Sequence, residues 1–191
     1  GSYFNGLARM NKQTGTCQDA TSLLQGNLNA GKPKVSCIIE DKNKNLWVGT
    51  YGSGLYKINL PTQHVTYYES TRNENDDWSI NRLPNDWISY LLEDREGMIW
   101  IGTYKGLAVL NPQTDNFINY KKQNNLLPGY VVYSLLESSN GEIWAGTSEG
   151  LVCLNKDRLT PVLSTAADGL PSDIICGLAE DEKKNIWIST H

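Results

Sequence analysis

The feature that most constrains this chain is an internal repeat that occurs four times. Each copy contains a tryptophan followed by an aliphatic residue or alanine, a small residue and threonine, and the tryptophans are Trp47, Trp100, Trp144 and Trp187. These are separated by 53, 44 and 43 residues. Two further patterns keep the same register: a Gly-Leu-x-x-apolar-Asn segment, and a glutamate seven residues before each tryptophan (Glu40, Glu93, Glu137 and Glu180). Self-similarity at such a period is typical of repeat architectures.

Each repeat is predicted to form four short strands and almost no helix. In the second copy, an apolar strand at 88–92 leads through a tight turn to the strand with the tryptophan. A Gly-Leu strand follows, and then a Pro/Thr/Asp/Asn turn and a strand at 117–120. Gly97 and Gly141 share one column of the turn, which indicates a positive φ angle there. Lys44 and Lys184 stand in that column in the other copies, so we expect some steric cost.

The first strand of each repeat is apolar on both faces, as expected for a sheet between two neighbouring sheets. Units of this length, stacked radially, are the blades of a β-propeller, and the tryptophans are then expected to be wedges between blades. The predicted fold class is all-β, with residues 1–191 forming a single partial propeller of three whole four-stranded blades and two complementary half-blades. The predicted boundaries are a half-blade at 1–30, blades at 33–70, 84–122 and 127–165, an insertion at 69–87, and a half-blade at 170–191.

Composition excludes several classes of partner. The net charge of −4 argues against a nucleic-acid surface, and no apolar run is long enough to span a membrane, so we expect no direct membrane contact. The start of the chain has no signal-peptide pattern. The four cysteines form no C-x-x-C pair, so no metal and no cofactor is expected. One disulfide in an oxidising compartment and buried free thiols acting as apolar filler are both open.

Three motifs suggest catalysis or metal binding, but their positions in the repeat favour structural roles. The segment 146–150 matches G-x-S-x-G, yet Ser148 lies in a strand turn of the repeat and lacks a partner histidine in the required context. The segment 41–52 begins like a calcium loop but lacks its glycine and its final glutamate. The repeated Glu-Asp pairs point to opposite faces of a strand, so we expect them to cap turns. No catalytic residue is predicted.

The most irregular segment is the insertion at 69–87, which accounts for the longest repeat spacing. It carries Trp78, Trp87, Arg72 and Arg82 outside the fixed columns of the repeat. Aromatic platforms with arginine and amide groups are typical of glycan-binding sites, so these residues are candidate ligand-binding residues. Alternatively, Trp78 packs the loop down and Trp87 only begins the inner strand. Tyr130 and Tyr133, near another inner strand, are weaker candidates.

The repeat resembles the two-component regulator propeller repeat. The resemblance rests on Leu-Pro, Glu-Asp, Gly, Trp-aliphatic-Gly-Thr and Gly-Leu, present as 83–107 and again from 127 and 170. Departures are Lys32-Pro33, which is two residues closer to its glutamate, Ser138 in place of Asp, and Ser189 in place of Gly. The family implies a periplasmic sensor region of a Bacteroidetes-type hybrid two-component system, with the histidine kinase outside this segment, that detects polysaccharide fragments.

We therefore predict a non-enzymatic, periplasmic sensor segment that binds a complex-polysaccharide fragment or transmits its binding. The alternatives are a propeller scaffold for protein–protein interaction and a polysaccharide lyase-type propeller enzyme. The expected partners are an oligosaccharide in the full sensor, the rest of the propeller and a second propeller. Open strand edges at the half-blades also predict a homodimer in which two copies form an eight-bladed ring.

Overall fold

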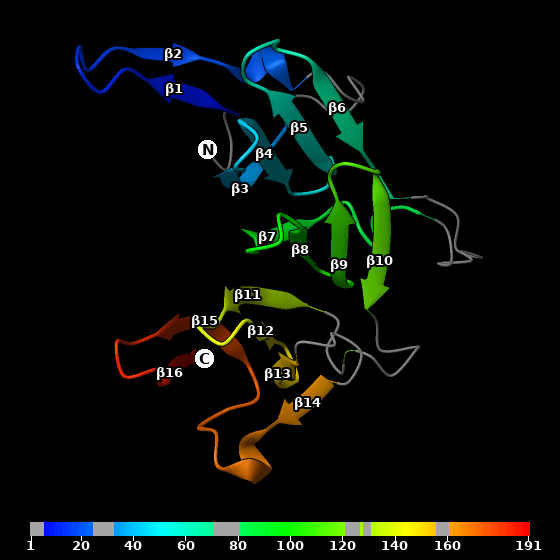
Figure 1. Cartoon of the computed structure of the whole chain (residues 1–191), viewed down its shortest axis with the longest axis vertical. Helices are drawn as coiled ribbons and strands as arrows, with labels where there is room; N and C mark the ends of the chain where they lie inside the picture. Colours follow the sequence, from blue (N-terminus) through cyan, green and yellow to red (C-terminus); the bar gives the residue numbers. More distant parts are fainter. Residues whose placement is uncertain (1–5, 25–32, 71–80, 121–126, 128–130, 156–160) are drawn as a thin grey trace.

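The protein is an open arc of β-sheets (Figure 1). The computed structural model describes residues 6–24, 33–70, 81–120, 127, 131–155 and 161–191. Within these ranges, three sheets have four antiparallel strands and two sheets have two, so the predicted all-β propeller segment is confirmed. Within the described ranges, the helices are short 3-10 turns, η1 (Thr21–Leu23) and η4 (Ala166–Asp168), and no helix has the length and apolarity to cross a membrane.

The strands follow one another along the chain as simple up-and-down sheets. The N-terminal half-blade contains β1 (Ala8–Met10) and β2 (Cys17–Asp19). Blade one contains β3 (Val35–Glu40), β4 (Asn45–Thr50), β5 (Leu55–Asn59) and β6 (Val65–Tyr68). Blade two contains β7 (Ile88–Glu93), β8 (Ile99–Thr103), β9 (Gly106–Asn111) and β10 (Asn116–Tyr120). Blade three contains β11 (Val132–Glu137), β12 (Ile143–Thr147), β13 (Gly150–Leu154) and β14 (Pro161–Ser164), and the C-terminal half-blade contains β15 (Ile175–Glu180) and β16 (Ile186–Thr190).

The first strands of successive blades are neighbours in space. β3 contacts β7, β7 contacts β11 and β11 contacts β15, so these inner strands form the concave side of the arc (Figure 1). Each inner strand has a register irregularity at the same repeat position, at Ser36, Ser89, Tyr133 and Cys176. A bulge turns the side chain at its position away from the regular alternation of the strand. The inner strands can therefore bend alike at one level of the arc.

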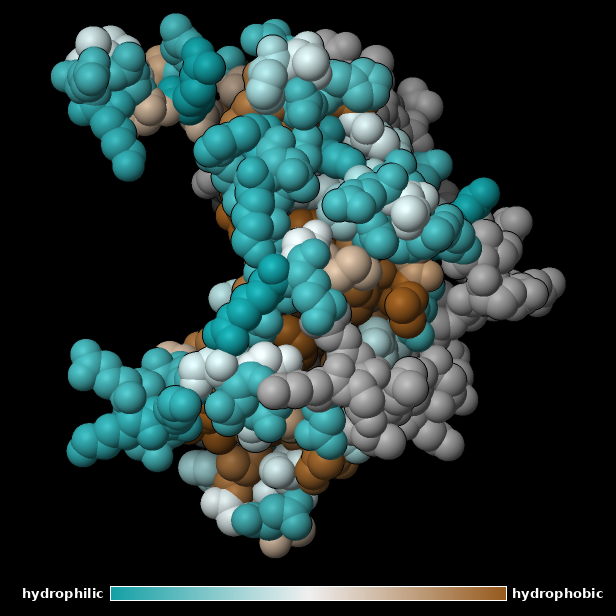
Figure 2. Space-filling model, viewed as in Figure 1, coloured by the Kyte–Doolittle hydropathy of each residue, from teal (hydrophilic) through white to brown (hydrophobic). Residues whose placement is uncertain are grey.

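The hydrophobic core lies between blades. Trp47 is fully buried with Ile88 and Ile101 of blade two, and Trp100 is fully buried with Val132 and Ile143 of blade three. Figure 2 shows hydrophobic residues between the sheets and hydrophilic residues over the turns, with a hollow on the open side of the arc. Each of these tryptophans thus packs its own blade against the next.

The other two tryptophans of the repeat are less buried, because no complete blade follows them among the described residues. Trp144 faces the two-stranded C-terminal half-blade and is only half-buried, and Trp187 on β16 is 67% exposed. The exposure of this one repeat position therefore follows the number of strands packed over it.

The hairpin turn between the first and second strands has the predicted left-handed residue. The φ angle is +80° at Gly97 and +84° at Gly141. Lys44 and Lys184, with side chains, adopt +64° and +68°. The turn geometry therefore overrides the preference of these lysines, as the sequence column indicated.

The cysteines form no disulfide, and they agree only in part with the alternative prediction of buried free thiols. All four are free, with Cys153 buried and Cys37 half-buried, and burial raises the pKa of each of these two thiols to about 11. Cys17 and Cys176 are exposed, so the prediction that the free thiols are buried filler is wrong for them. Both lie on the half-blades, where a covering sheet is missing on one side.

Candidate functional site

The aspartate of the Glu-Asp pair organises its own hairpin turn. The Asp41 carboxylate accepts a hydrogen bond from the buried indole Nε1 of Trp47 at 2.8 Å and from the side chain and backbone of Asn45. Asp94 accepts one from Trp100 Nε1 at 2.7 Å and two from backbone N–H groups of its turn. One carboxylate therefore closes the turn and also satisfies the polar atom of the tryptophan wedge.

Hydrogen bonds lower the pKa of two of the turn aspartates, Asp41 and Asp181. Burial acts to raise the pKa of Asp41, but hydrogen bonds from the Asn45 side chain, the turn backbone and the indole outweigh it and lower the pKa overall. Hydrogen bonds from Asn185 and the turn similarly lower the pKa of Asp181 to about 2. A carboxylate with a lowered pKa is a poor general acid at neutral pH, which agrees with the predicted capping role.

Blade three departs from this arrangement because Ser138 replaces the aspartate. Among the described residues, the Ser138 hydroxyl is hydrogen-bonded to Glu142 alone, through the backbone N–H at 3.2 Å and the carboxylate at 3.3 Å. Trp144 Nε1 is buried and has no hydrogen-bond partner among the described residues. An unpaired buried donor costs about 1–3 kcal/mol.

Restoring the turn should stabilise the protein. In Ser138→Asp with Glu142→Asn, the new carboxylate can accept from Trp144 Nε1, and the asparagine occupies the column of Asn45 and Asn185, which donate to their aspartates. We expect the free energy of unfolding to rise by about 1–2 kcal/mol in urea denaturation. Ser138→Asp alone should gain less, because its charge faces Glu142. An unchanged or lower midpoint for the double variant would contradict this account.

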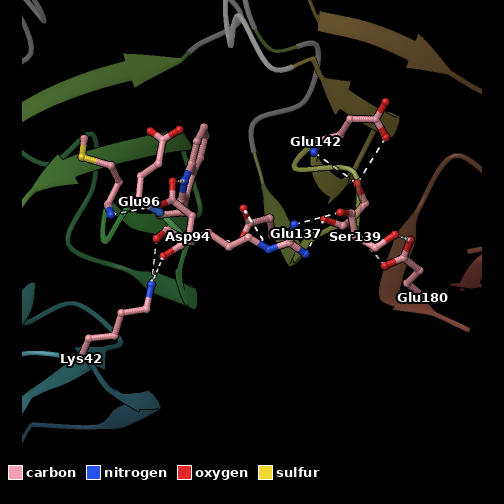
Figure 3. A network of polar contacts seen from close by, with 11 residues as sticks. Lys42, Asp94, Glu96, Glu137, Ser139, Glu142 and Glu180 are labelled. Atoms are coloured by element: carbon pink, nitrogen blue, oxygen red, sulfur yellow. Dashed lines mark hydrogen bonds and ion pairs between the residues drawn. The ribbon is translucent and has the colours of Figure 1, made fainter. Parts of the chain in front are cut away.

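Three of the four repeated glutamates cap the turn of the preceding blade. Glu93 accepts the backbone N–H of Lys42 at 3.1 and 3.2 Å, and Glu137 accepts that of Arg95 at 3.0 Å. Glu180 accepts the N–H and hydroxyl of Ser139, and Figure 3 shows these contacts passing from turn to turn. The capping role predicted from sequence is confirmed, and the glutamates serve the contact between blades.

Basic side chains strengthen two of these contacts. Lys42 Nζ donates to the backbone carbonyls of Asp94 and Arg95 at 2.9 and 3.0 Å (Figure 3). The Arg95 guanidinium donates to the carbonyls of Ser138 and Ser139. The repeated glutamates and aspartates therefore have a structural role. We call the contact of each glutamate with the preceding turn a latch.

A different group of residues forms an exposed aromatic surface at the opposite end of the strands. Trp87 lies at the start of β7, and Tyr51 and Tyr104 follow β4 and β8. The ring centroids are 6.1 Å apart for Tyr51 and Trp87, 6.0 Å for Tyr51 and Tyr104, and 5.6 Å for Trp87 and Tyr104. All three pairs meet edge to face. We call these three residues the aromatic cluster.

The backbone fixes this cluster across two blades. Tyr51 of blade one forms an isolated β-bridge with Trp87 of blade two, and Tyr104 N–H donates to the Trp87 carbonyl at 3.1 Å. Gly52 has a φ angle of +90°, and a Cβ there would lie 3.2 Å from Trp87 Nε1, so glycine lets the indole lie against the turn.

The cluster presents both ring surface and polar atoms to solvent. Trp87 is 48% exposed and Tyr104 is 36% exposed. Among the described residues, neither Trp87 Nε1 nor the Tyr104 hydroxyl has a hydrogen-bond partner. Exposed aromatic rings with available donors are suited to binding a ligand that is partly apolar and partly hydroxylated.

The structure separates the residues that the sequence grouped in the insertion. Trp87 belongs to the aromatic cluster, whereas Arg82 is exposed beside the outer strand β10, where its carbonyl accepts from Asn119 at 3.1 Å. Arg72, Trp78 and Tyr130 lie outside the described residues. Tyr133 is half-buried at the bulge of β11.

Tyr51 and Tyr104 were missed from sequence. Each directly follows the threonine of its repeat, and this column holds Ser148 and His191 in the other copies. Two tyrosines in a column that is otherwise polar were the available signal. Their proximity to Trp87 follows from the packing of neighbouring blades, which the separate repeats do not display.

Ser148 lies in the turn between β12 and β13, as the repeat predicted, and its N–H donates to the Val131 carbonyl. Within the described part of the chain, no three His, Cys, Asp or Glu side chains gather as a metal site.

Comparison with known protein families identifies the repeat. The family described as two component regulator propeller matches at residues 31–52, 82–105, 126–149 and 169–191. The extracellular domain of a B. thetaiotaomicron protein described as a hybrid two component system is similar in structure, with a TM-score of 0.76 and 25% identity over 95% of this chain and 23% of that chain. A search among curated proteins found no match.

Two more solved structures share the fold. The extracellular domain of a B. thetaiotaomicron protein described as a one component system has a TM-score of 0.74 and 23% identity, over 97% of this chain and 24% of that one. Virginiamycin B lyase from Staphylococcus aureus has a TM-score of 0.67 and 12% identity, over 96% of this chain and 55% of the lyase. The chain spans about a quarter of the length of the two B. thetaiotaomicron domains. At 12% identity the lyase indicates a common fold alone.

Proposed function

We propose that this chain, which belongs to the two-component regulator propeller family, is a non-enzymatic segment of a periplasmic sensor and contacts a polysaccharide fragment through its aromatic cluster. The observation that carries the proposal is the exposed group of Tyr51, Trp87 and Tyr104, held by the backbone of two blades.

The chemistry of the cluster favours a carbohydrate. A sugar ring has an apolar C–H face, which can lie on the exposed ring of Trp87, and hydroxyls at its edge, which can pair with Trp87 Nε1 and the Tyr104 hydroxyl. The repeated carboxylates lie in the latches at the other end of the strands and are occupied by backbone donors. Binding without catalysis therefore accounts better for the available groups than a lyase reaction does.

The position of the cluster also suits a sensor. Tyr51 belongs to blade one, and Trp87 and Tyr104 belong to blade two, so a ligand across the rings would contact both blades. The same blades are joined by a buried tryptophan and by the Glu93 latch. Binding could thus be passed on as a small shift between two rigid sheets, with the blades themselves unchanged.

The test is a binding screen of the purified chain. Oligosaccharides of xylan, pectin, mannan and chondroitin would be arrayed, and each hit measured by calorimetry. We expect Trp87→Ala and Tyr104→Ala to weaken binding at least tenfold, which corresponds to about 1.4 kcal/mol. Ile118→Ala, which removes an exposed side chain from the outer strand β10, is the matched control and should bind like the parent chain.

Two outcomes would contradict the proposal. Equal binding by the parent chain and Trp87→Ala would place the ligand elsewhere. Absence of any carbohydrate hit, together with aromatic-dependent capture of a defined protein, would favour the protein-interaction scaffold.

A further inference from the structure

The aromatic cluster lies on a rim that recurs in each blade. The residue that follows the threonine of the repeat donates its backbone N–H to the carbonyl of the residue just before the inner strand, at 2.8 to 3.1 Å. In blades one, two and three these pairs are Tyr51 with Lys34, Tyr104 with Trp87, and Ser148 with Val131. We call these six residues the rim. The repeated bond places the three pairs at the same end of their sheets.

The turns that hold Tyr104 and Ser148 have the same internal bonds. The Thr103 hydroxyl donates to the Gly106 carbonyl at 2.7 Å and accepts the backbone N–H two residues later at 3.1 Å. The Thr147 hydroxyl makes the two equivalent bonds in blade three, at 2.8 and 3.1 Å. Because the turns match, Ser148 occupies in blade three the position that Tyr104 occupies in blade two.

Successive blades meet at one level just below the rim. A Cβ on Gly49 of blade one would lie 2.7 Å from Ile88 Cγ2 of blade two. A Cβ on Gly102 of blade two would lie 3.0 Å from Val132 Cγ1 of blade three. Each glycine comes two residues before a rim residue, and each contacted residue directly follows one. The rim of blade two therefore adjoins that of blade three, as the rims of blades one and two adjoin within the aromatic cluster.

Blade three offers a different chemistry from the two aromatic blades. Val131 and Ser148 are half-buried, and the Ser148 hydroxyl accepts the Val131 N–H at 3.4 Å. Among the described residues, this hydroxyl donates to no acceptor. Serine is much smaller than the tyrosines at the same position, Tyr51 and Tyr104, so a ligand can approach the turn of blade three more closely.

The charges at the rim balance. Lys34 and Lys105 are positive, and Asp86 and Glu149 are negative, and each lies in the rim or one residue from it. The rim therefore has no net attraction for an acidic sugar. An uncharged, hydroxyl-rich ligand suits it better, since hydrogen bonds and contacts with aromatic rings need no net charge.

We propose that the rim binds a neutral, linear oligosaccharide across blades two and three, an inference that rests on the carbohydrate function proposed above. One sugar residue lies against the aromatic cluster, and the next reaches Val131 and Ser148. The Ser148 hydroxyl donates to an oxygen of this second residue, and the Val131 side chain contacts its C–H groups. Ser148 is therefore a specificity-determining residue, which favours a chain over a single sugar.

Calorimetry with oligomers of graded length tests this inference. The probes are linear oligomers of xylose and of mannose, from the monosaccharide to the tetrasaccharide, titrated into the purified chain. We expect the dissociation constant to fall at least about tenfold between the monosaccharide and the longer oligomers, because only the longer ones contact both blades. Trp87→Ala should weaken binding at every length.

Two variants of Ser148 separate the second contact from the first. Ser148→Ala removes the donor and should weaken the longer oligomers about fivefold, with the monosaccharide unchanged. Ser148→Tyr should fold, because Tyr104 carries the same side chain in the matching turn. Its ring should fill the second position and remove the gain with length. Ile118→Ala, on the outer strand β10, is the control and should match the parent chain at every length.

The outcomes distinguish this inference from the proposed function. An affinity that does not rise with length, or a gain that both Ser148 variants keep, would overturn the second contact alone. Binding restricted to galacturonic acid oligomers and weakened by Trp87→Ala would also retain the function and overturn the inference. Equal binding by the parent chain and Trp87→Ala, or no binding of any oligomer, would overturn both.

Discussion

Replacing Asp94 with alanine is expected to destabilise the protein by about 3–5 kcal/mol. Asp94 is 1% exposed, and its carboxylate accepts bonds from Trp100 Nε1 and from two backbone N–H groups. Its removal leaves the Trp100 indole donor buried between blades two and three without its carboxylate acceptor. The loss should appear as a lower midpoint in urea denaturation followed by tryptophan fluorescence.

Asp181→Ala is the matched control for this prediction. Asp181 accepts equivalent bonds from its turn backbone and from Trp187, and it also accepts from the Asn185 side chain. Trp187 is largely exposed, so water can take over its indole donor. The control should therefore lose much less stability in the same urea assay. Equal losses would mean that turn closure, independent of the buried indole, accounts for the effect.

Gly49→Ser is expected to cost about 2–4 kcal/mol. A Cβ at this position would lie 2.7 Å from Ile88 Cγ2, 3.0 Å from Ile88 Cβ and 2.6 Å from Cys37 Sγ. Ile88 is fully buried on the inner strand of the next blade, so it has little room to retreat. Either β7 shifts away from β4, which opens the core around Trp47, or the side chain adopts a strained rotamer.

The natural counterpart of this substitution is Ser189, and among the described residues no further blade packs against it. Ser189→Gly should therefore change the stability little in the same urea assay. A small effect of Gly49→Ser would show that the interface between blades one and two can adjust to a hydroxymethyl group, contrary to the packing argument.

The aromatic cluster shows how far a functional site could be predicted. Trp87 was a candidate because it lies outside the fixed columns of the repeat, and in the structure its side chain is exposed. Tyr51 was not a candidate, because it lies 36 residues before Trp87 and in another blade. Nothing within one repeat indicates that its ring contacts Trp87. Arg82 was grouped with Trp87 by closeness in sequence, yet its backbone follows β10. The contacts between blades decide which residues share a surface.

The repeat by itself determined the fold class, the strand order within each blade, the left-handed turn positions and the position of one tryptophan in each blade. Each of these depends on interactions within a single repeat, which recur in every copy and leave the same pattern in the sequence. Only the tertiary structure decided how far each of these tryptophans is buried. One sequence position is fully buried at Trp100, half-buried at Trp144 and exposed at Trp187. The difference arises because the burial of this side chain depends on the neighbouring sheet, which a single repeat does not contain.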